Sequence, residues 1–265
     1  MVRVISGLLL LGATVALLVI GLYGIYAIVL VAGGIALWEF RRLSDRWGYR
    51  APSWLLYPLG LFFALSGTVL KGVPLDVVLS VALIAGLSVF LVLPGQREGL
   101  GRWAMGLAGA IYVGLPFNYY LLLYQDADHA PGLAWLLLIV VTVVVSDSAA
   151  LLIGRRLGRH PFFPAISPNK TVEGALAGLV CSVPVMLLGG SLLLHLSLVH
   201  SALIGLLIGI TAQIGDLVES QMKRLAGVKD SSNVIPGHGG ILDRMDSAMF
   251  PPIVVFLYAH YTGLL

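Results

Sequence analysis

The sequence predicts an all-α polytopic membrane protein with about nine transmembrane helices. Hydrophobic residues make up 58% of the 265 residues and charged residues only 11%, and the mean hydropathy is +0.97. A soluble domain carries about a quarter of its residues as charges. Apolar stretches also recur along the whole chain, each close to the roughly 20 residues that a spanning helix needs. We therefore expect helical spans joined by loops and little else.

Nine apolar stretches are candidates for spans. They cover residues 5–22, 24–40, 53–71, 75–94, 103–124, 132–153, 173–196, 199–222 and 245–264. The first follows Arg3 and has some features of a signal peptide. Its apolar part is longer than a typical signal core, and a second span follows almost at once. We therefore interpret it as the first arm of a retained hairpin.

The distribution of cationic residues predicts the orientation. An odd number of spans places the two termini on opposite sides of the membrane. We place the N-terminus in the cytoplasm and the C-terminus on the opposite side. All 16 Lys and Arg residues except Lys71 then fall on the cytoplasmic side, as the positive-inside rule requires. Such a basic face suits anionic lipids or phosphates. Cys181 is the only cysteine, which excludes an intrachain disulfide and a cysteine-based metal site.

Polar residues at membrane depth divide the chain into two predicted regions. Residues 1–125 would embed the protein in the membrane and give access to lipid. Residues 126–265 would be catalytic, with cytoplasmic loops at 154–172 and 223–244. In the first region Glu39 stands out, and it is either an interfacial anchor paired with a neighbouring arginine or a contact to a lipid head group.

The second region carries carboxylates inside apolar stretches, where charges are costly and are candidates for function. They are Asp147, Asp216 and Glu219. If residues 199–222 are helical, one face of the helix carries Asp216, Glu219, Ser220, Lys223 and Arg224. Glu219 can form a structural ion pair with Lys223, four residues on. Asp216 has no cation one turn along, which predicts a metal ion as its partner.

The loop before the last span has the composition of a phosphate site. Three glycines surround His238, so the backbone can approach a ligand and point N–H groups at phosphate oxygens. Asp243 and Asp246 lie where the last span begins, and with Asp216 they offer the oxygen ligands that Mg²⁺ prefers. A second cation stays open. The phosphate counter-charges are predicted to be Lys223, Arg224, Lys229 and Arg244.

A second loop, ISPNKTVEG (166–174), precedes the span at 173–196. We expect Lys170 to contact phosphate. Thr171 either contacts phosphate or caps the following helix. Arg155, Arg156 and Arg159 are explained by the positive-inside rule. Together the two loops predict a metal–phosphate site that acts by positioning and charge neutralisation.

The segment SQMKRLAGVKDSSNVIPGHGGILDRMD resembles the signature of the phosphatidate cytidylyltransferase (CDP-diacylglycerol synthase) family. The matching positions are Ser220, Lys223, Arg224, Lys229, Asp230, Ser232, Ile235, Pro236, His238, Gly239, Gly240, Asp243, Arg244 and Asp246. Asp147 with Gly154 and Arg155, followed by Ser167-Pro168 and Lys170-Thr171, is similar to a second stretch of that family. There Leu151 stands where we expect an aromatic residue. The resemblance is sharp over residues 140–250.

The resemblance implies a reaction in which CTP and phosphatidate give CDP-diacylglycerol and pyrophosphate, with Mg²⁺ as the cofactor. It implies a multi-pass inner-membrane enzyme with a cytoplasmic active site. The implied metal ligands and catalytic residues are Asp216, Asp243 and Asp246, with Lys223, Arg224 and His238 also catalytic. The implied substrate-binding residues are Lys170, Thr171, Ser220, Lys223, Arg224, Lys229, His238, Gly239, Gly240 and Arg244. Membrane lipid is an expected partner, nucleic acid is not, and a homodimer stays open.

Two other functions compete with this interpretation. One is a CTP-dependent enzyme for another lipid, such as a polyprenol kinase or a CDP-archaeol synthase. The complete HGG-x-x-DR-x-D pattern argues against the kinases, whereas the lipid tail leaves no trace in the sequence. The other is a secondary transporter that couples ions through Asp147, Asp216 and Glu219. The sequence has no internal repeat and its polar residues gather at one face, which favours an enzyme.

Overall fold

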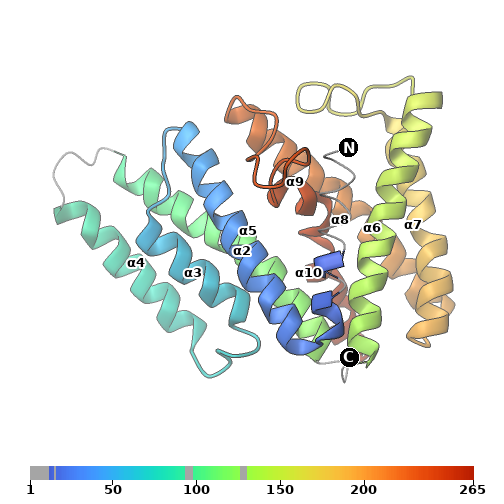
Figure 1. Ribbon diagram of the computed structural model, residues 1–265, viewed down its shortest axis with the longest axis horizontal. Coiled ribbons are helices and arrows are strands. Elements are labelled where there is room, and N and C mark those ends of the chain that lie inside the picture. Colours follow the sequence, from blue (N-terminus) through green and yellow to red (C-terminus); the bar gives the residue numbers. More distant parts are fainter. Residues whose placement is uncertain (1–11, 15, 93–97, 126–129) are drawn as a thin grey trace. The chain divides into compact units, whose positions relative to one another are not determined.

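The computed structural model describes residues 12–14, 16–92, 98–125 and 130–265 (Figure 1). These residues form helices and no β-strand, which confirms the all-α prediction. They divide into two compact units, and the chain changes unit within one long helix, at the end of another and within a short turn of helix. Each unit is described by itself.

Unit 1 comprises Met1–Leu121 and Leu225–Arg244. Its described helices are α2 (Leu22–Arg46), α3 (Ser53–Leu65), α4 (Leu75–Val92) and most of α5 (Gly99–Gln125). Small residues let these helices approach closely, as is common in membranes. A Cβ on Gly109 of α5 would collide with the ring of Phe40 on α2. Trp103 donates a hydrogen bond to the carbonyl of Ala82 on α4, at 3.0 Å.

Unit 2 comprises Leu122–Arg224 and Met245–Leu265. Its helices are α6 (Ala130–Leu157), α7 (Val172–Leu193), α8 (Leu198–Leu225), the 3₁₀ turn η1 (Asp246–Ala248) and α10 (Pro251–Tyr261). Gly174 and Gly178 of α7 lie against the backbone of α6, where a side chain would not fit. Gln213 of α8 donates to the carbonyl of Ala175 at 2.9 Å. The three long helices therefore form one packed group.

Five described helices are long and apolar enough to cross a membrane: α2, α5, α6, α7 and α8. They match the spans predicted at 24–40, 103–124, 132–153, 173–196 and 199–222. The stretch predicted at 53–71 contains only the 13-residue α3, and 75–94 contains α4. Residues 5–11 and 15 of the stretch 5–22 lie outside the described residues. The total of nine spans and the side of each terminus stay predictions.

The last predicted span differs from the structure. Residues 242–264 do not begin as one continuous helix, because α9 (Leu242–Met245) is followed by η1 and then by α10. Pro251 and Pro252 occupy the first helical positions of α10, where a missing N–H does no harm and a new helix readily begins. Asp243 and Asp246 consequently belong to different helical elements and to different units.

The boundary between the units also differs from the predicted regions. Residues 225–244, which were assigned to the catalytic half of the chain, group with the N-terminal helices of unit 1. The physical reason is that Ser232, Ile241 and Leu242 donate hydrogen bonds to the carboxylate of Glu39 on α2.

Candidate functional site

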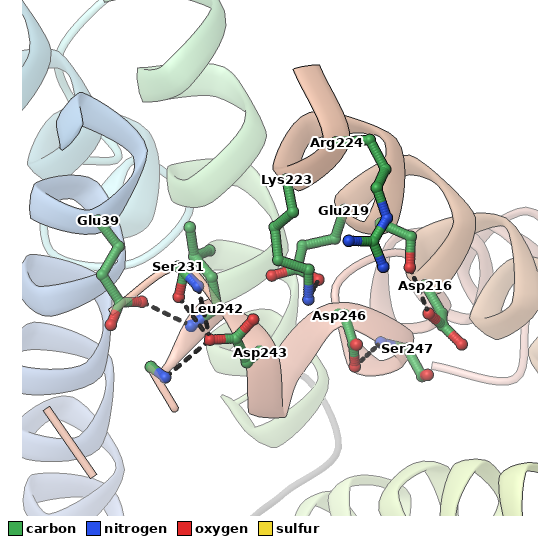
Figure 2. A network of polar contacts seen from close by, with 12 residues as sticks. Glu39, Asp216, Glu219, Lys223, Arg224, Ser231, Leu242, Asp243, Asp246 and Ser247 are labelled. Carbon is green, nitrogen blue, oxygen red and sulfur yellow. Dashed lines mark hydrogen bonds and ion pairs between the residues drawn. The ribbon is translucent and has the colours of Figure 1, made fainter. Parts of the chain in front are cut away.

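Unit 2 contains a carboxylate cluster formed by Asp147 of α6, Asp216 of α8 and Asp246 of η1. Ser247 links two of its members, since its hydroxyl donates to Asp147 and its N–H donates to Asp246 Oδ1 at 2.8 Å (Figure 2). Burial raises the pKa of Asp246 to about 6, and the charges of Asp216 and Asp147 act in the same direction. The cluster thus concentrates negative charge that would favour a bound cation.

Lys170 lies against this cluster. Its Nζ is 2.7 Å from Asp216 Oδ2, and both side chains are about three-quarters buried. Asp216 therefore has an internal cation as a partner, which was not predicted, and its role as a metal ligand stays a prediction. Its partner, Lys170, lies in the loop before α7. Helical spacing within α8 gives no information about contacts with that loop. The carboxylate of Asp216 also accepts a hydrogen bond from Ser220 at 3.3 Å.

The C-terminal end of α8 carries the remaining charges of the predicted helix face. Lys223 pairs with Glu219, whose side chain is fully buried, so the structural alternative of an i,i+4 ion pair is borne out. Arg224 is exposed, and its Nε donates to the carbonyl of Ile166 at 3.3 Å. Arg224 therefore joins α8 to the loop that carries Lys170. A phosphate contact of Arg224 stays a prediction.

The loop from 158 to 171 is fixed at its base by α7. Glu173 accepts hydrogen bonds from the N–H groups of Arg159 and His160, at 3.1 and 3.2 Å. It also contacts His160 Nδ1 at 2.6 Å. Thr171 caps α7 by accepting from the N–H of Gly174 at 3.2 Å, which bears out the capping alternative. These contacts set the direction in which Lys170 leaves the backbone.

Unit 1 contains the glycine loop, defined here as residues 231–241, and Glu39 holds it to α2. The Glu39 side chain is fully buried. It accepts hydrogen bonds from Ser232 Oγ at 2.5 Å and from the N–H of Ile241 at 3.0 Å. It also accepts one from the N–H of Leu242 at 2.7 Å (Figure 2). Both interpretations offered for Glu39 are wrong, because its partners lie about 200 residues away in the sequence.

Asp243 closes the other side of the same loop. Its Oδ2 accepts three hydrogen bonds of 2.8 Å, from the N–H and the hydroxyl of Ser231 and from the N–H of Gly240. The side chain is 7% exposed. One oxygen of Asp243 is therefore used to shape the loop, a role that the sequence interpretation did not include.

The glycines of the loop have identifiable roles. Gly239 has a φ of +80°, a conformation that L side chains rarely adopt. Gly240 lies so close to Glu39 and Ser231 that a Cβ would collide with both. The His238 N–H donates to the carbonyl of Ile235 at 2.9 Å, which makes a tight turn at the tip. His238 is half-buried, while Lys229 and Arg244 are exposed at the two ends of the segment.

The residues present fit a hard cation in their chemistry. Aspartate oxygens are the ligands that Mg²⁺ prefers, and the crowded cluster in unit 2 supplies them. Among the described residues, no three acidic, histidine or cysteine side chains already surround one point that could hold a metal. Binding of the ion would therefore rotate carboxylate side chains toward it.

Comparison with known proteins adds the family. A family model described as "Cytidylyltransferase family" matches residues 1–262. Phosphatidate cytidylyltransferase of Staphylococcus haemolyticus is 41% identical over 163 residues, covering 61% of this chain and 60% of the relative. The enzyme of the same name from Bacillus subtilis is 40% identical over 155 residues, covering 58% and 57%. The match thus spans about 60% of the length of the curated relatives.

Proposed function

The chain belongs to the cytidylyltransferase family, and we propose that it transfers CMP from CTP to phosphatidate, giving CDP-diacylglycerol and pyrophosphate. The observation that carries the proposal is the arrangement in unit 2, where Lys170 and Lys223 stand beside a cluster of carboxylates. Carboxylates that crowd one another suit a divalent cation, and neighbouring lysines suit the phosphates that accompany it. The names of the similar enzymes support the same reaction.

The proposed chemistry is an in-line substitution at the α-phosphorus of CTP. A phosphate oxygen of phosphatidate forms a bond to this phosphorus, and the bond from the phosphorus to the bridging oxygen of the β-phosphate breaks. The electron pair of that bond leaves with pyrophosphate. A phosphate monoester is already ionised near neutral pH, so the attacking oxygen needs no strong general base. The protein then acts mainly by positioning and charge neutralisation.

The chain's own residues divide this work. Lys170, Lys223 and Arg224 would bind the triphosphate and stabilise the negative charge that develops on the leaving pyrophosphate. Thr171 and Ser220 would contact the same phosphates. The His238 side chain and the exposed backbone beside Gly239 would contact substrate oxygens, with Lys229 and Arg244 as flanking charges. Mg²⁺, held in unit 2 by Asp216 and Asp246, would supply further charge neutralisation when bound. Asp243 stays a ligand predicted from the sequence.

The proposed active site faces the cytoplasm of a cell membrane. Support comes from the distribution of cations, because Lys170, Lys223, Lys229 and the arginines near them fall on one predicted side of the spans. CTP is a soluble anion, and a basic face would attract it. The lipid substrate could reach such a site without leaving the bilayer.

The test uses the full-length protein in detergent micelles with phosphatidate, Mg²⁺ and CTP that is radiolabelled at either the α- or the γ-phosphate. We expect the α-label to enter the lipid fraction as CDP-diacylglycerol and the γ-label to appear only in pyrophosphate. Diacylglycerol replaces phosphatidate as the matched control, and it should accept no label. Transfer of the γ-label to lipid would identify a kinase and overturn the proposal, as would the absence of lipid label.

A further inference from the structure

Unit 1 contains a cleft of about 290 Å³ between the end of α2 and the segment that leads into the glycine loop. Its polar lining consists mainly of Arg42, Arg46, Lys229, Asp230, Ser231 and Ser232. The lining thus includes three cationic residues and one carboxylate. None of these residues belongs to the carboxylate cluster of unit 2.

The walls of this cleft are fixed within one unit. Ser232 is hydrogen-bonded to the buried Glu39 of α2 at 2.5 Å, and Ser231 is hydrogen-bonded to Asp243 at 2.8 Å. Arg42 and Arg46 are four residues apart on α2 and therefore lie on one face of it. The cleft is consequently formed before any ligand arrives, which lowers the cost of binding.

The end of α2 has the features of a membrane interface. α2 is apolar enough to span a bilayer, and Trp38 near its end is 37% exposed. The guanidinium of Arg42 lies over the Trp38 ring, 4.8 Å from its centroid. Exposed tryptophan beside arginine is typical of the head-group layer, which is where lipid phosphates lie. Clusters of basic residues at this position bind anionic lipid head groups.

The size of the cleft limits its ligand. Pockets for drug-sized ligands occupy about 300–1,000 Å³, so this cleft is at the lower end of the range. It accommodates a phosphate head group more readily than a complete nucleotide. Arg42, Arg46 and Lys229 supply charged hydrogen-bond donors of the kind that phosphate oxygens accept.

We infer that this cleft binds the phosphate of an anionic membrane lipid. The lipid has two possible sources. One is phosphatidate, and this source rests on the proposed function, in which it is the acceptor substrate. The other is an anionic lipid that does not react, such as phosphatidylglycerol. In either case Lys229 binds lipid phosphate together with Arg42 and Arg46.

The experiment measures the affinity of the detergent-solubilised full-length protein for four separate ligands: short-chain phosphatidate, phosphatidylglycerol, phosphatidylcholine and CTP. The variant is the double substitution Arg42→Gln and Arg46→Gln. Each basic residue near a membrane surface contributes about a fivefold factor in affinity, so the two together predict a loss of about 25-fold for anionic lipid. Affinity for CTP and phosphatidylcholine should not change. Arg50→Gln is the matched control, because Arg50 forms an exposed pair with Asp45 outside the cleft.

Loss of affinity for phosphatidate alone identifies the substrate as the ligand of the cleft. Loss of affinity for both anionic lipids identifies a general site for anionic lipid. A loss for CTP with lipid affinity retained, or no loss at all, overturns the inference. Arg46→Gln alone, with a fivefold expected loss, guards against misfolding of the double variant. Wild type that binds anionic lipid but transfers no CMP would reject the proposed function and leave this site standing.

Discussion

The acidic residues of the two units have opposite kinds of partners. In unit 1, Glu39 and one oxygen of Asp243 each accept three hydrogen bonds from hydroxyl and backbone N–H groups. In unit 2, Asp216 is paired with a lysine and lies near other carboxylates. A buried carboxylate surrounded by donors is well solvated by the protein and holds a fixed geometry. A carboxylate crowded by others is a better candidate for chemistry.

This difference separates acidic residues that maintain the structure from acidic residues that are proposed to act in catalysis. Glu39 and Asp243 set the shape of the glycine loop, so their loss should affect folding first. Asp216 and Asp246 belong to a cluster whose charge is only partly compensated, so their loss should affect activity first. The following substitutions test that separation.

Asp216→Asn should have the largest effect. It removes the charge that is paired with Lys170 and a proposed ligand of Mg²⁺, so CMP transfer should fall by about 10³-fold, as when a main electrostatic contact is lost. The thermal midpoint should change little, because the side chain is not part of the packed core. Activity and thermal unfolding are measured on the same preparation.

Asp45→Asn is the matched control, since Asp45 is an exposed partner of Arg50 in unit 1. It should retain full activity. If Asp216→Asn instead lowered the thermal midpoint as strongly as it lowered activity, Asp216 would be a structural residue like Glu39, and the contrast between the units would fail.

Glu39→Gln should have the second largest effect and the opposite order of symptoms. A glutamine NH₂ would face N–H and hydroxyl donors, leaving buried donors unsatisfied, which costs about 3 kcal/mol of stability. The thermal midpoint should fall even in the absence of substrates, and activity should fall with it as the glycine loop loosens. Thermal unfolding with and without CTP provides the measurement.

The same exchange at Glu98, which is exposed, controls for the loss of a negative charge and should have no effect. An unchanged thermal midpoint for Glu39→Gln would mean that the hydrogen bonds from Ser232, Ile241 and Leu242 contribute nothing to the stability of unit 1.

Much of this architecture was predictable, and the missed side-chain contacts share one cause. The five long helices follow from local hydropathy, and the Glu219–Lys223 pair follows from helical spacing. Glu39 and the partner of Asp216 were not predicted, because their contacts join residues far apart in sequence. A carboxylate beside an apolar run does signal a buried partner, but it does not say which segment supplies that partner.

The break between α9 and α10 was missed for a different reason. Residues 245–264 are mostly apolar, which suggests one span, whereas Pro251 and Pro252 are the local signal that a new helix begins there. The glycine loop shows the reverse case. Its phosphate-site composition was recognised, yet Gly240 is also required because Glu39 and Ser231 leave no room for a side chain.

Lys170→Gln should have a smaller effect than Asp216→Asn. It removes one cation from the proposed triphosphate site, so KM for CTP should rise by about tenfold, the range of one charge-assisted contact. Lys170→Arg keeps the charge and should recover part of the loss. The steady-state kinetics of both variants give the measurement.

A double substitution shows what Lys170 contacts. If Lys170 serves only to hold Asp216, then Lys170→Gln should add nothing to Asp216→Asn, since both remove the same pair. If Lys170 also binds phosphate, the double variant should bind CTP about tenfold more weakly than Asp216→Asn alone. Binding is measured without turnover, so the low activity of Asp216→Asn does not obscure the comparison.

For Asp246→Asn, the sign of the change in stability distinguishes the two units. Its pKa in the folded protein is about 6, above the ordinary value of 3.8. Between these values the folded protein binds more protons than the unfolded chain, so this carboxyl makes stability fall as pH rises through that window. In EDTA at pH 7, Asp246→Asn should therefore melt about 3 °C above wild type, whereas Glu39→Gln should melt below it. Mg²⁺ favours the ionised carboxylate, so adding it should raise the thermal midpoint of wild type more than that of Asp246→Asn. A lower midpoint for Asp246→Asn in EDTA would show that Asp246, like Glu39, is stabilised by its surroundings in the charged form, and would remove the distinction between the two units.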